Sequence, residues 1–258
     1  MPLLLLLLGC RETLTPGVMA PDRDPSRRWE QVLSRVVDRQ GYVDYGALEA
    51  NRGPLDDYLA WLATEQAWEG KITKDWHAQY LNAYNALVMY EVLVRGRPAS
   101  VLDVRGAIPI RGYKFFHGTQ FRLGPDLLSL SEIEHERIRW KEMDYRDHAA
   151  MNCASRSCPP LRPELYRPNL LQTQLTDQMR VWIMDDDRGV RVTNEKATFS
   201  PIFDWYARDF AFFSAGEDIC SIAAIHATGT KRQMLYSLAE RGCPHDYFEY
   251  DWSLNDSR

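Results

Sequence analysis

A chain of 258 residues is long enough to bury a large hydrophobic core without disulfides or metals, and its 45% hydrophobic and 26% charged residues are typical of a globular protein. The formal net charge of -5 at pH 7 argues against nucleic-acid binding, because nucleic-acid-binding proteins usually present a basic face to phosphates. The 8 Trp and 13 Tyr indicate an aromatic core rather than an aromatic pocket.

The N-terminus is typical of an export signal. Consecutive leucines occupy residues 3–8, a run far shorter than the roughly 20 apolar residues that span a bilayer. Gly9 and Cys10 follow, so residues 1–10 are predicted to be a signal peptide with a Leu-Leu-Gly-Cys ending that resembles the bacterial lipobox. In bacterial lipoproteins that cysteine is lipidated, and a residue other than Asp after it, here Arg11, resembles the sorting pattern for the outer membrane. We therefore expect a lipid on Cys10 to anchor the protein to the outer membrane, in the periplasm. An ordinary secretory leader or a chance leucine run is the alternative.

Export also bears on the other cysteines. Cys153, Cys158, Cys220 and Cys243 are an even number in an oxidising compartment. They are compatible with two disulfides, or with one disulfide and two free thiols.

The chain after the leader is predicted to contain a tether and one domain. Residues 11–25 are rich in Pro, Asp, Arg and Thr without an apolar period, which predicts a flexible tether. Residues 26–258 are predicted to form a single globular domain. Within it, the apolar spacing of residues 28–39 predicts an amphipathic helix that ends at Gly41, and residues 54–64 predict another helix.

Residues 76–94 predict a helix that is apolar almost all round, and such a helix is buried on all sides. Asn82 and Asn85 lie within it three residues apart, on one face. A buried amide without a partner costs about 1–3 kcal/mol. We expect both amides to be buried and hydrogen-bonded, and at least one to contact the loop that contains Cys153. Holding the backbone of a neighbouring loop is the commoner role of a buried asparagine.

The middle of the chain predicts short strands and a capped helix. Residues 114–116 and 120–123 predict a hairpin. A capping box at residues 129–132 or 131–134 predicts the start of a helix. Residues 147–152 predict a short strand. The expected fold class is therefore α+β, with a buried central helix packed on a mainly antiparallel sheet.

Six motifs stand out along the chain. They are Val43-Asp44-Tyr45, LNAYNAL at 81–87, LSEIEH at 130–135, His148 with NCASRSCPPL at 152–161, IFDWY at 202–206 and YDWSLN at 250–255. Together they resemble the domain of unknown function 547 family over residues 29–255, in a bacterial lipoprotein-like member. The family name implies no established activity. Plant members are sometimes fused to a glutaredoxin-like domain, which implies thiol chemistry. In plant members the position of Cys158 is often serine, whereas Cys153 is kept.

Cys153 is the preferred candidate for chemistry, because a nearby histidine can lower the pKa of a cysteine and make it a nucleophile. His148 lies five residues upstream, on the opposite face of a strand, so it reaches Cys153 only through a bulge or turn. His135 comes from another element and is the preferred base. Asn82 or Asn85 would orient it in a Cys-His-Asn arrangement. A buried helix on an antiparallel sheet also suggests distant kinship with papain-like and transglutaminase-like folds, although there the helix carries the cysteine.

The preferred function is a periplasmic thiol-dependent hydrolase or acyltransferase that acts on peptide or cell-wall amide bonds, with Cys153 as nucleophile. The polar and basic residues Ser155, Arg156, Ser157 and Lys114 are the expected substrate-binding groups. No cofactor is expected, and the acidic composition argues against a nucleic-acid partner.

Three alternatives remain open. A non-catalytic envelope binding or scaffold lipoprotein would use the Asn, His and Cys residues only to fix a loop. A zinc site from His135, His148, Cys153 and Cys158 is disfavoured, because Cys-x4-Cys is longer than the usual Cys-x2-Cys spacing, so no metal is expected. A structural disulfide would join Cys153 to Cys158 or to a C-terminal cysteine.

Overall fold

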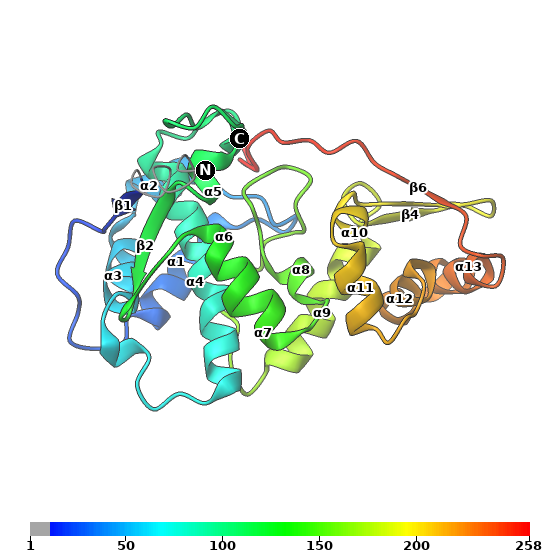
Figure 1. The fold of residues 1–258 in the computed structure, drawn as a ribbon, viewed down its shortest axis with the longest axis horizontal. Helices are drawn as coiled ribbons and strands as arrows, with labels where there is room; N and C mark the ends of the chain where they lie inside the picture. The colour runs from blue at the N-terminus through cyan, green and yellow to red at the C-terminus, as the bar shows by residue number, and fades with distance from the viewer. Residues whose placement is uncertain (1–10) are drawn as a thin grey trace, which may run out of the picture.

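The computed structural model describes residues 11–258, and helix α4 (Thr73–Val94) lies at the centre of its N-terminal half (Figure 1). Every residue from His77 to Leu93 is buried, which confirms the predicted central helix. Three earlier helices pack around α4 and one another. They are α1 (Ser26–Val36), α2 (Tyr45–Ala50) and α3 (Gly53–Leu62).

The predicted signal peptide and Cys10 lie outside the described residues. Among residues 11–258, no helix combines the length and the apolar character needed to cross a bilayer.

The first described residues join a small sheet. Strand β1 (Glu12–Leu14) pairs in parallel with β2 (Thr119–Leu123), and β2 pairs antiparallel with β3 (Asp126–Leu128). The predicted flexible tether is therefore wrong for β1, because its backbone groups are satisfied by β2 and Leu14 packs against the core.

The hairpin lies later in the chain than predicted. Residues Tyr113–Phe116 form the short helix α5, not a strand. The reverse turn joins β2 to β3 through Gly124 and Pro125. Gly124 has a φ of 56°, a left-handed conformation that glycine adopts without strain. A two-residue turn therefore forms at Gly124 and Pro125 more readily than at the predicted position.

The C-terminal half has a second core and a second sheet. Strand β4 (Val190–Val192) pairs antiparallel with β5 (Ala197–Phe199), which pairs in parallel with β6 (His245–Tyr247). Trp182 and Phe203 stack inside this core. The helices of this half are α9 (Leu171–Met184), α10 (Ile202–Trp205), α11 (Ala207–Phe213), α12 (Ile219–His226) and α13 (Gly229–Ala239). The class is α+β as predicted, at 48% helix and 11% strand, with the strands divided between two small sheets.

A third group of helices, formed by residues 130–150, lies between the two halves. The capping box at Ser129 and Glu132 is present, since the Glu132 N–H donates to Ser129 Oγ and the Ser129 N–H donates to Glu132 Oε2. The predicted strand at 147–152 is wrong, because Asp147–Ala150 forms a helical turn, α8, that packs on α9. The remaining elements are η2 (Glu65–Ala67), η3 (Val101–Asp103), α6 (Leu130–Glu132), the π-helix η4 (Ile133–Arg139) and α7 (Trp140–Glu142).

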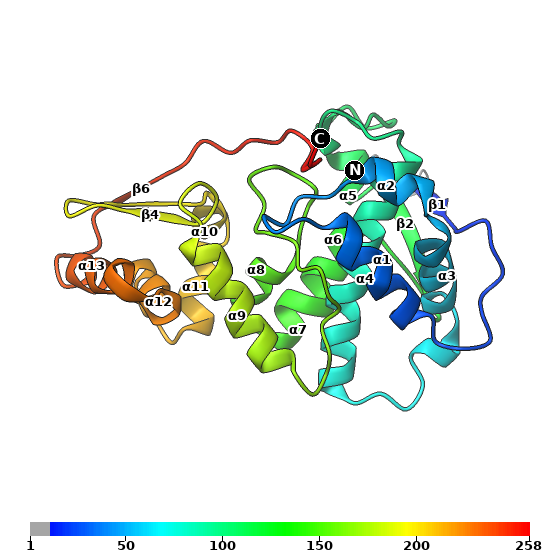
Figure 2. The same cartoon turned by 180° about the vertical axis from the view of Figure 1, so that it is seen from behind.

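The C-terminal segment connects the two halves. After β6 it runs back across the molecule to the N-terminal half, which the view from behind shows clearly (Figure 2). Its Leu254 forms a β-bridge with Ser155, and its Ser253 forms one with Ser100. The loop after α8 is therefore covered by a strand-like segment that lies about 100 residues further along the chain.

Candidate thiol site

The predicted cysteine and both predicted histidines line one cavity between the two halves. The cavity has a volume of about 230 Å³ and contains Cys153, Cys158, His135 and His148 in its wall. Aromatic side chains from the end of α10, from the residue that follows it and from the C-terminal segment form much of the remaining wall. They include Trp205, Tyr206, Tyr250 and Trp252.

Cys153 and Cys158 face each other at this cavity. Their Sγ atoms are 2.6 Å apart, and the Cys153 N–H donates to Cys158 Sγ at 2.9 Å. Two hydroxyls also lie near Cys153 Sγ, namely Ser155 Oγ at 3.1 Å and Tyr250 OH at 3.4 Å. Ala154, in the loop between Cys153 and Cys158, has a φ of 61°, which is uncommon for a residue other than glycine. This conformation bends the chain so that the two sulfurs lie together.

The surroundings of Cys153 stabilise a thiolate. The hydrogen bond from the Cys158 thiol lowers the pKa of Cys153 to about 7, against the opposing effect of burial, and the Ser155 and Tyr250 hydroxyls lower it further. Burial raises the pKa of Cys158 well above its ordinary value, and its hydrogen bond to Cys153 adds to that rise. Cys153 is half-buried and Cys158 is buried, so the cysteine whose pKa is lowered is also the more exposed of the two.

Asn85 fixes the start of the cysteine loop. Its Nδ2 donates to Ala150 O, and its Oδ1 accepts the N–H of Asn152, both at 2.9 Å. Asn152 then spans the loop, donating to Pro159 O and accepting from Ala154 N–H. The predictions that Asn85 is buried, hydrogen-bonded and in contact with this loop are confirmed.

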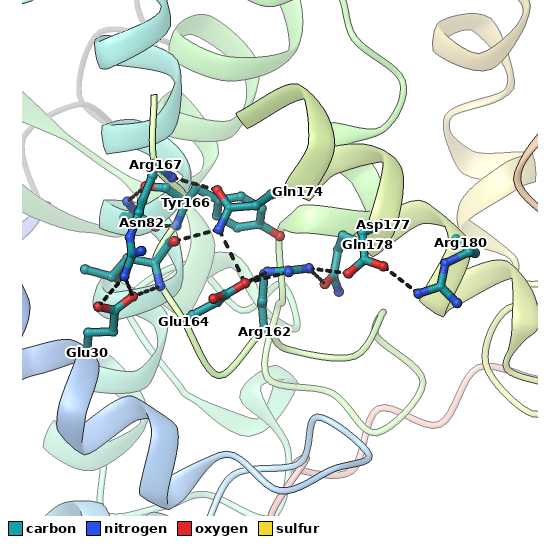
Figure 3. A network of polar contacts seen from close by, with 11 residues as sticks. Glu30, Asn82, Arg162, Glu164, Tyr166, Arg167, Gln174, Asp177, Gln178 and Arg180 are labelled. Carbon is teal, nitrogen blue, oxygen red and sulfur yellow. Dashed lines mark hydrogen bonds and ion pairs between the residues drawn. The ribbon is translucent and has the colours of Figure 1, made fainter. Parts of the chain in front are cut away.

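Asn82 holds a different loop. Its Nδ2 donates to Tyr166 O and its Oδ1 accepts the Tyr166 N–H, both at 2.8 Å, beside the ion pair between Arg167 and Glu30 (Figure 3). The side-chain NH2 and C=O groups of both Asn82 and Asn85 therefore bind backbone groups. The expected Cys-His-Asn arrangement is wrong, because within residues 11–258 the hydrogen-bond partners of Asn82 and Asn85 are backbone groups and not histidines.

We expect Asn85→Leu to lower the free energy of unfolding by about 1–3 kcal/mol, because two backbone groups lose their partner. Asn82→Leu is the matched control, since it loses the same two bonds at a loop that does not contain Cys153. Urea unfolding should show a similar loss for both variants. Only Asn85→Leu should also change the alkylation rate of Cys153. Equal alkylation rates in the two variants would contradict the assigned role of Asn85.

His148 is paired with a carboxylate that the sequence pattern did not predict. Its Nε2 lies 2.9 Å from Asp209 Oδ2, and its ring packs on Tyr206 with the centroids 4.3 Å apart. The helical turn α8 removes the objection that His148 and Cys153 lie on opposite faces of a strand. Asp209 had one signal in the sequence: it is an acid within the aromatic run 203–213, and a buried charge needs a partner.

Arg139 connects the two histidines. Its Nε donates to Asp209 Oδ2 at 2.7 Å, and its Nη1 donates to His135 Nδ1. Its guanidinium also lies over the Tyr206 ring, 4.4 Å from the centroid. Although burial opposes it, the hydrogen bonds from His148 and Arg139 lower the pKa of Asp209 to about 2. A carboxylate held in this way fixes the orientation of the His148 ring.

Of the four predicted substrate-binding residues, one lies beside Cys153 and three bind other parts of the protein. Ser155 lies beside Cys153, as described above. Arg156 donates to Asp256 O, and Ser157 Oγ accepts the N–H of Asp251, so both bind the C-terminal segment. Lys114 pairs with Glu12 at 2.7 Å and is not in the cavity wall.

The alternatives for the cysteines are also decided by geometry. Cys220 and Cys243 form a disulfide, and Cys153 and Cys158 are free thiols. Within residues 11–258, three or more metal-binding side-chain atoms converge to within 4.8 Å of one another only at Asp218, Cys220 and Cys243. Two of those three are the disulfide cysteines, so the described residues do not assemble the zinc site that the sequence analysis considered.

The cysteine loop, α4 and α8 lie within a segment that resembles known sequences. Residues 73–183 match the family model described as "Protein of unknown function, DUF547". Over these residues the chain is similar to that family. The match includes every described cavity residue from Tyr84 to Cys158, whereas Asp209, Tyr206 and Tyr250 lie beyond it. No curated protein and no solved structure matches the chain.

Proposed function

We propose that this protein is a thiol-dependent hydrolase or acyltransferase acting on peptide or cell-wall amide bonds, with Cys153 as nucleophile. One observation carries the proposal. The accessible sulfur of Cys153, with a pKa of about 7 because the Cys158 thiol donates to it, lies in the wall of the same cavity as a histidine paired with a carboxylate. A cysteine, a base and a group that orients the base are the parts that nucleophilic catalysis requires.

His148 is the preferred base, in place of His135. Asp209 accepts from Nε2 of His148, which leaves Nδ1 as the nitrogen that transfers protons. Nδ1 of His135 accepts a hydrogen bond from Arg139, and that side chain is 39% exposed against 3% for His148. We therefore assign His135 to the mouth of the cavity, where it contacts substrate.

The reaction follows from these positions. His148 Nδ1 takes the proton of the Cys153 thiol, and the thiolate attacks the amide carbonyl carbon. The C–N bond then breaks as His148 gives that proton to the leaving amine. A thioester on Cys153 remains. Water, or a second amine in an acyltransferase, then attacks the thioester while His148 accepts its proton, and the Cys153 sulfur is released.

The assay that tests this function uses cross-linked cell-wall muropeptides as substrate and mass spectrometry as readout. The reduced wild-type protein should cleave or exchange an amide bond, and Cys153→Ala should lose that activity. Ser157→Ala is the control, because Ser157 lies in the same loop but contacts the C-terminal segment. If wild type and Cys153→Ala are equally inactive and Cys153 alkylates slowly, the non-catalytic scaffold lipoprotein becomes the better interpretation.

We further propose that the protein is anchored in the periplasm by a lipid on Cys10. The support is the Leu-Leu-Gly-Cys ending and the arginine after it. Cells labelled with a radioactive fatty acid should yield labelled protein, and Cys10→Ser should take up no label. A wild-type protein without label, or a Cys10→Ser protein with as much as wild type, contradicts the anchor and leaves the thiol chemistry untouched.

A further inference from the structure

The Sγ atom of Cys158 lies closer to the Sγ atom of Cys153 than a hydrogen bond between them requires. The two Sγ atoms are 2.6 Å apart, compared with about 2.05 Å in a disulfide. The loop between them is closed on itself, because the Cys158 N–H donates to Ser155 O and Asn152 Nδ2 donates to Pro159 O. A short movement of one side chain therefore suffices to join the sulfurs, with no change in the surrounding fold.

We propose that Cys153 and Cys158 also form a reversible dithiol–disulfide pair that exchanges with low-molecular-weight or protein disulfides. The Cys153 thiolate attacks one sulfur of the incoming disulfide, whose S–S bond breaks and releases the first thiolate. Cys158 then attacks Cys153 Sγ and gives its proton to the departing thiolate. The Cys153–Cys158 bond forms and the second thiolate leaves. The pair loses two electrons and the incoming disulfide gains them.

The division of roles between the two sulfurs supports this order. Both sulfurs belong to residues of the cavity wall, but Cys153 is half-buried whereas Cys158 is buried, so an external disulfide meets Cys153 more readily than Cys158. Hydrogen bonds from Cys158, Ser155 and Tyr250 favour the thiolate on Cys153. An accessible attacking sulfur and a sheltered resolving sulfur are what two-step exchange needs.

The other disulfide of the chain provides a contrast. Cys220 is fully buried and Cys243 is 5% exposed, within the second core. Accessible disulfides are the ones that exchange, whereas buried disulfides resist reduction. Cys220–Cys243 therefore serves as an internal reference that stays oxidised while the Cys153–Cys158 pair changes state.

This inference rests on the same nucleophile as the proposed function, but it requires no amide substrate. It also adds a consequence for that function. While Cys153 is bonded to Cys158, its sulfur cannot attack a carbonyl carbon, so amide cleavage stops until a thiol reduces the pair.

The test is a titration of the native full-length chain with mixtures of reduced and oxidised glutathione, followed by acid trapping and peptide mass spectrometry. Wild type should gain a Cys153–Cys158 cross-link, with a loss of two hydrogens, at a reproducible glutathione ratio. Cys158→Ser should stop at glutathione bound to Cys153, and Cys153→Ser should give neither product. Circular dichroism checks that both variants are folded, and the wild-type titration decides the question without them.

Two results would overturn the inference. One is a wild-type protein in which Cys153 and Cys158 stay reduced at every ratio. The other is stable glutathione on wild-type Cys153 without a cross-link. Failure of the proposed function is recognised separately, because amide cleavage is measured on the fully reduced wild type, where the cross-link is absent by design.

Discussion

Alkylation of the native, reduced protein by iodoacetamide should follow a thiolate with an apparent pKa of about 7, and Cys158→Ala should raise that pKa. The reason is that the Cys158 thiol is the main donor to Cys153 Sγ. A return to the free-cysteine pKa of about 8.5 would reduce the thiolate fraction at pH 7, and hence the rate, by about 15-fold. Peptide mapping after alkylation at several pH values gives the rate at each cysteine.

Cys158→Ser is the matched control for this measurement. A serine at this position keeps a hydroxyl donor within the same loop, so the pKa of Cys153 should rise less than in Cys158→Ala. Cys153→Ser should abolish rapid labelling altogether. If Cys158→Ala and Cys158→Ser leave the pH profile of wild type unchanged, Cys158 does not activate Cys153 and the thiolate site proposed above is wrong.

Asp209→Asn should lower the turnover of amide substrates, or of the activated ester p-nitrophenyl acetate, on the order of 10²–10⁴-fold. Asp209 Oδ2 accepts from His148 Nε2, and an amide can present a donor there instead, which favours the wrong tautomer of the ring. The loss should appear mainly in kcat. Steady-state kinetics on the reduced protein measures it.

Asp204→Asn is the control for the change of charge, because Asp204 is an exposed acid on α10 in the same aromatic segment. It should keep near wild-type turnover. Equal kinetics for Asp204→Asn and Asp209→Asn would exclude His148 as the base. The assignment would then return to His135, which also lines the cavity.

The same aspartate gives a pH dependence of stability. The pKa of Asp209 is lowered to about 2 in the folded protein, from about 3.9 in an unfolded chain. Its contribution to stability is therefore fully present above pH 4 and is lost as the pH falls from about 4 to about 2. Urea midpoints of wild type and Asp209→Asn should differ at pH 6 and converge near pH 2. A difference that stays constant over this range contradicts the lowered pKa.

Local patterns were sufficient for several features of this protein. The run of apolar residues in α4 has no polar face, so burial was the only stable outcome, and the two buried amides then required partners. The capping box at Ser129 depends on residues three apart, and the structure contains it. These features are determined by neighbours in the chain, which is why the amino-acid order alone determined them.

Other features depend on residues that only the tertiary structure brings together. A stretch of six residues at 147–152 is too short for its pattern to separate a strand from a helical turn, and its packing on α9 decided in favour of α8. Asp209 reaches His148 across 61 positions, and Tyr250 reaches Cys153 across 97. No local sequence pattern predicts contacts between residues so far apart in the chain.

The candidate site likewise has features that the sequence predicts and features that only the tertiary structure decides. Cys153, His148 and His135 were identified as candidates from their residue types and motifs, because a thiol and an imidazole carry their chemistry wherever they are placed. Which histidine has a carboxylate, and which sulfur is accessible, depends on how the two halves and the C-terminal segment close around the cavity. The sequence therefore determined the candidate groups, and the packing of distant segments determined their exposure and their partners.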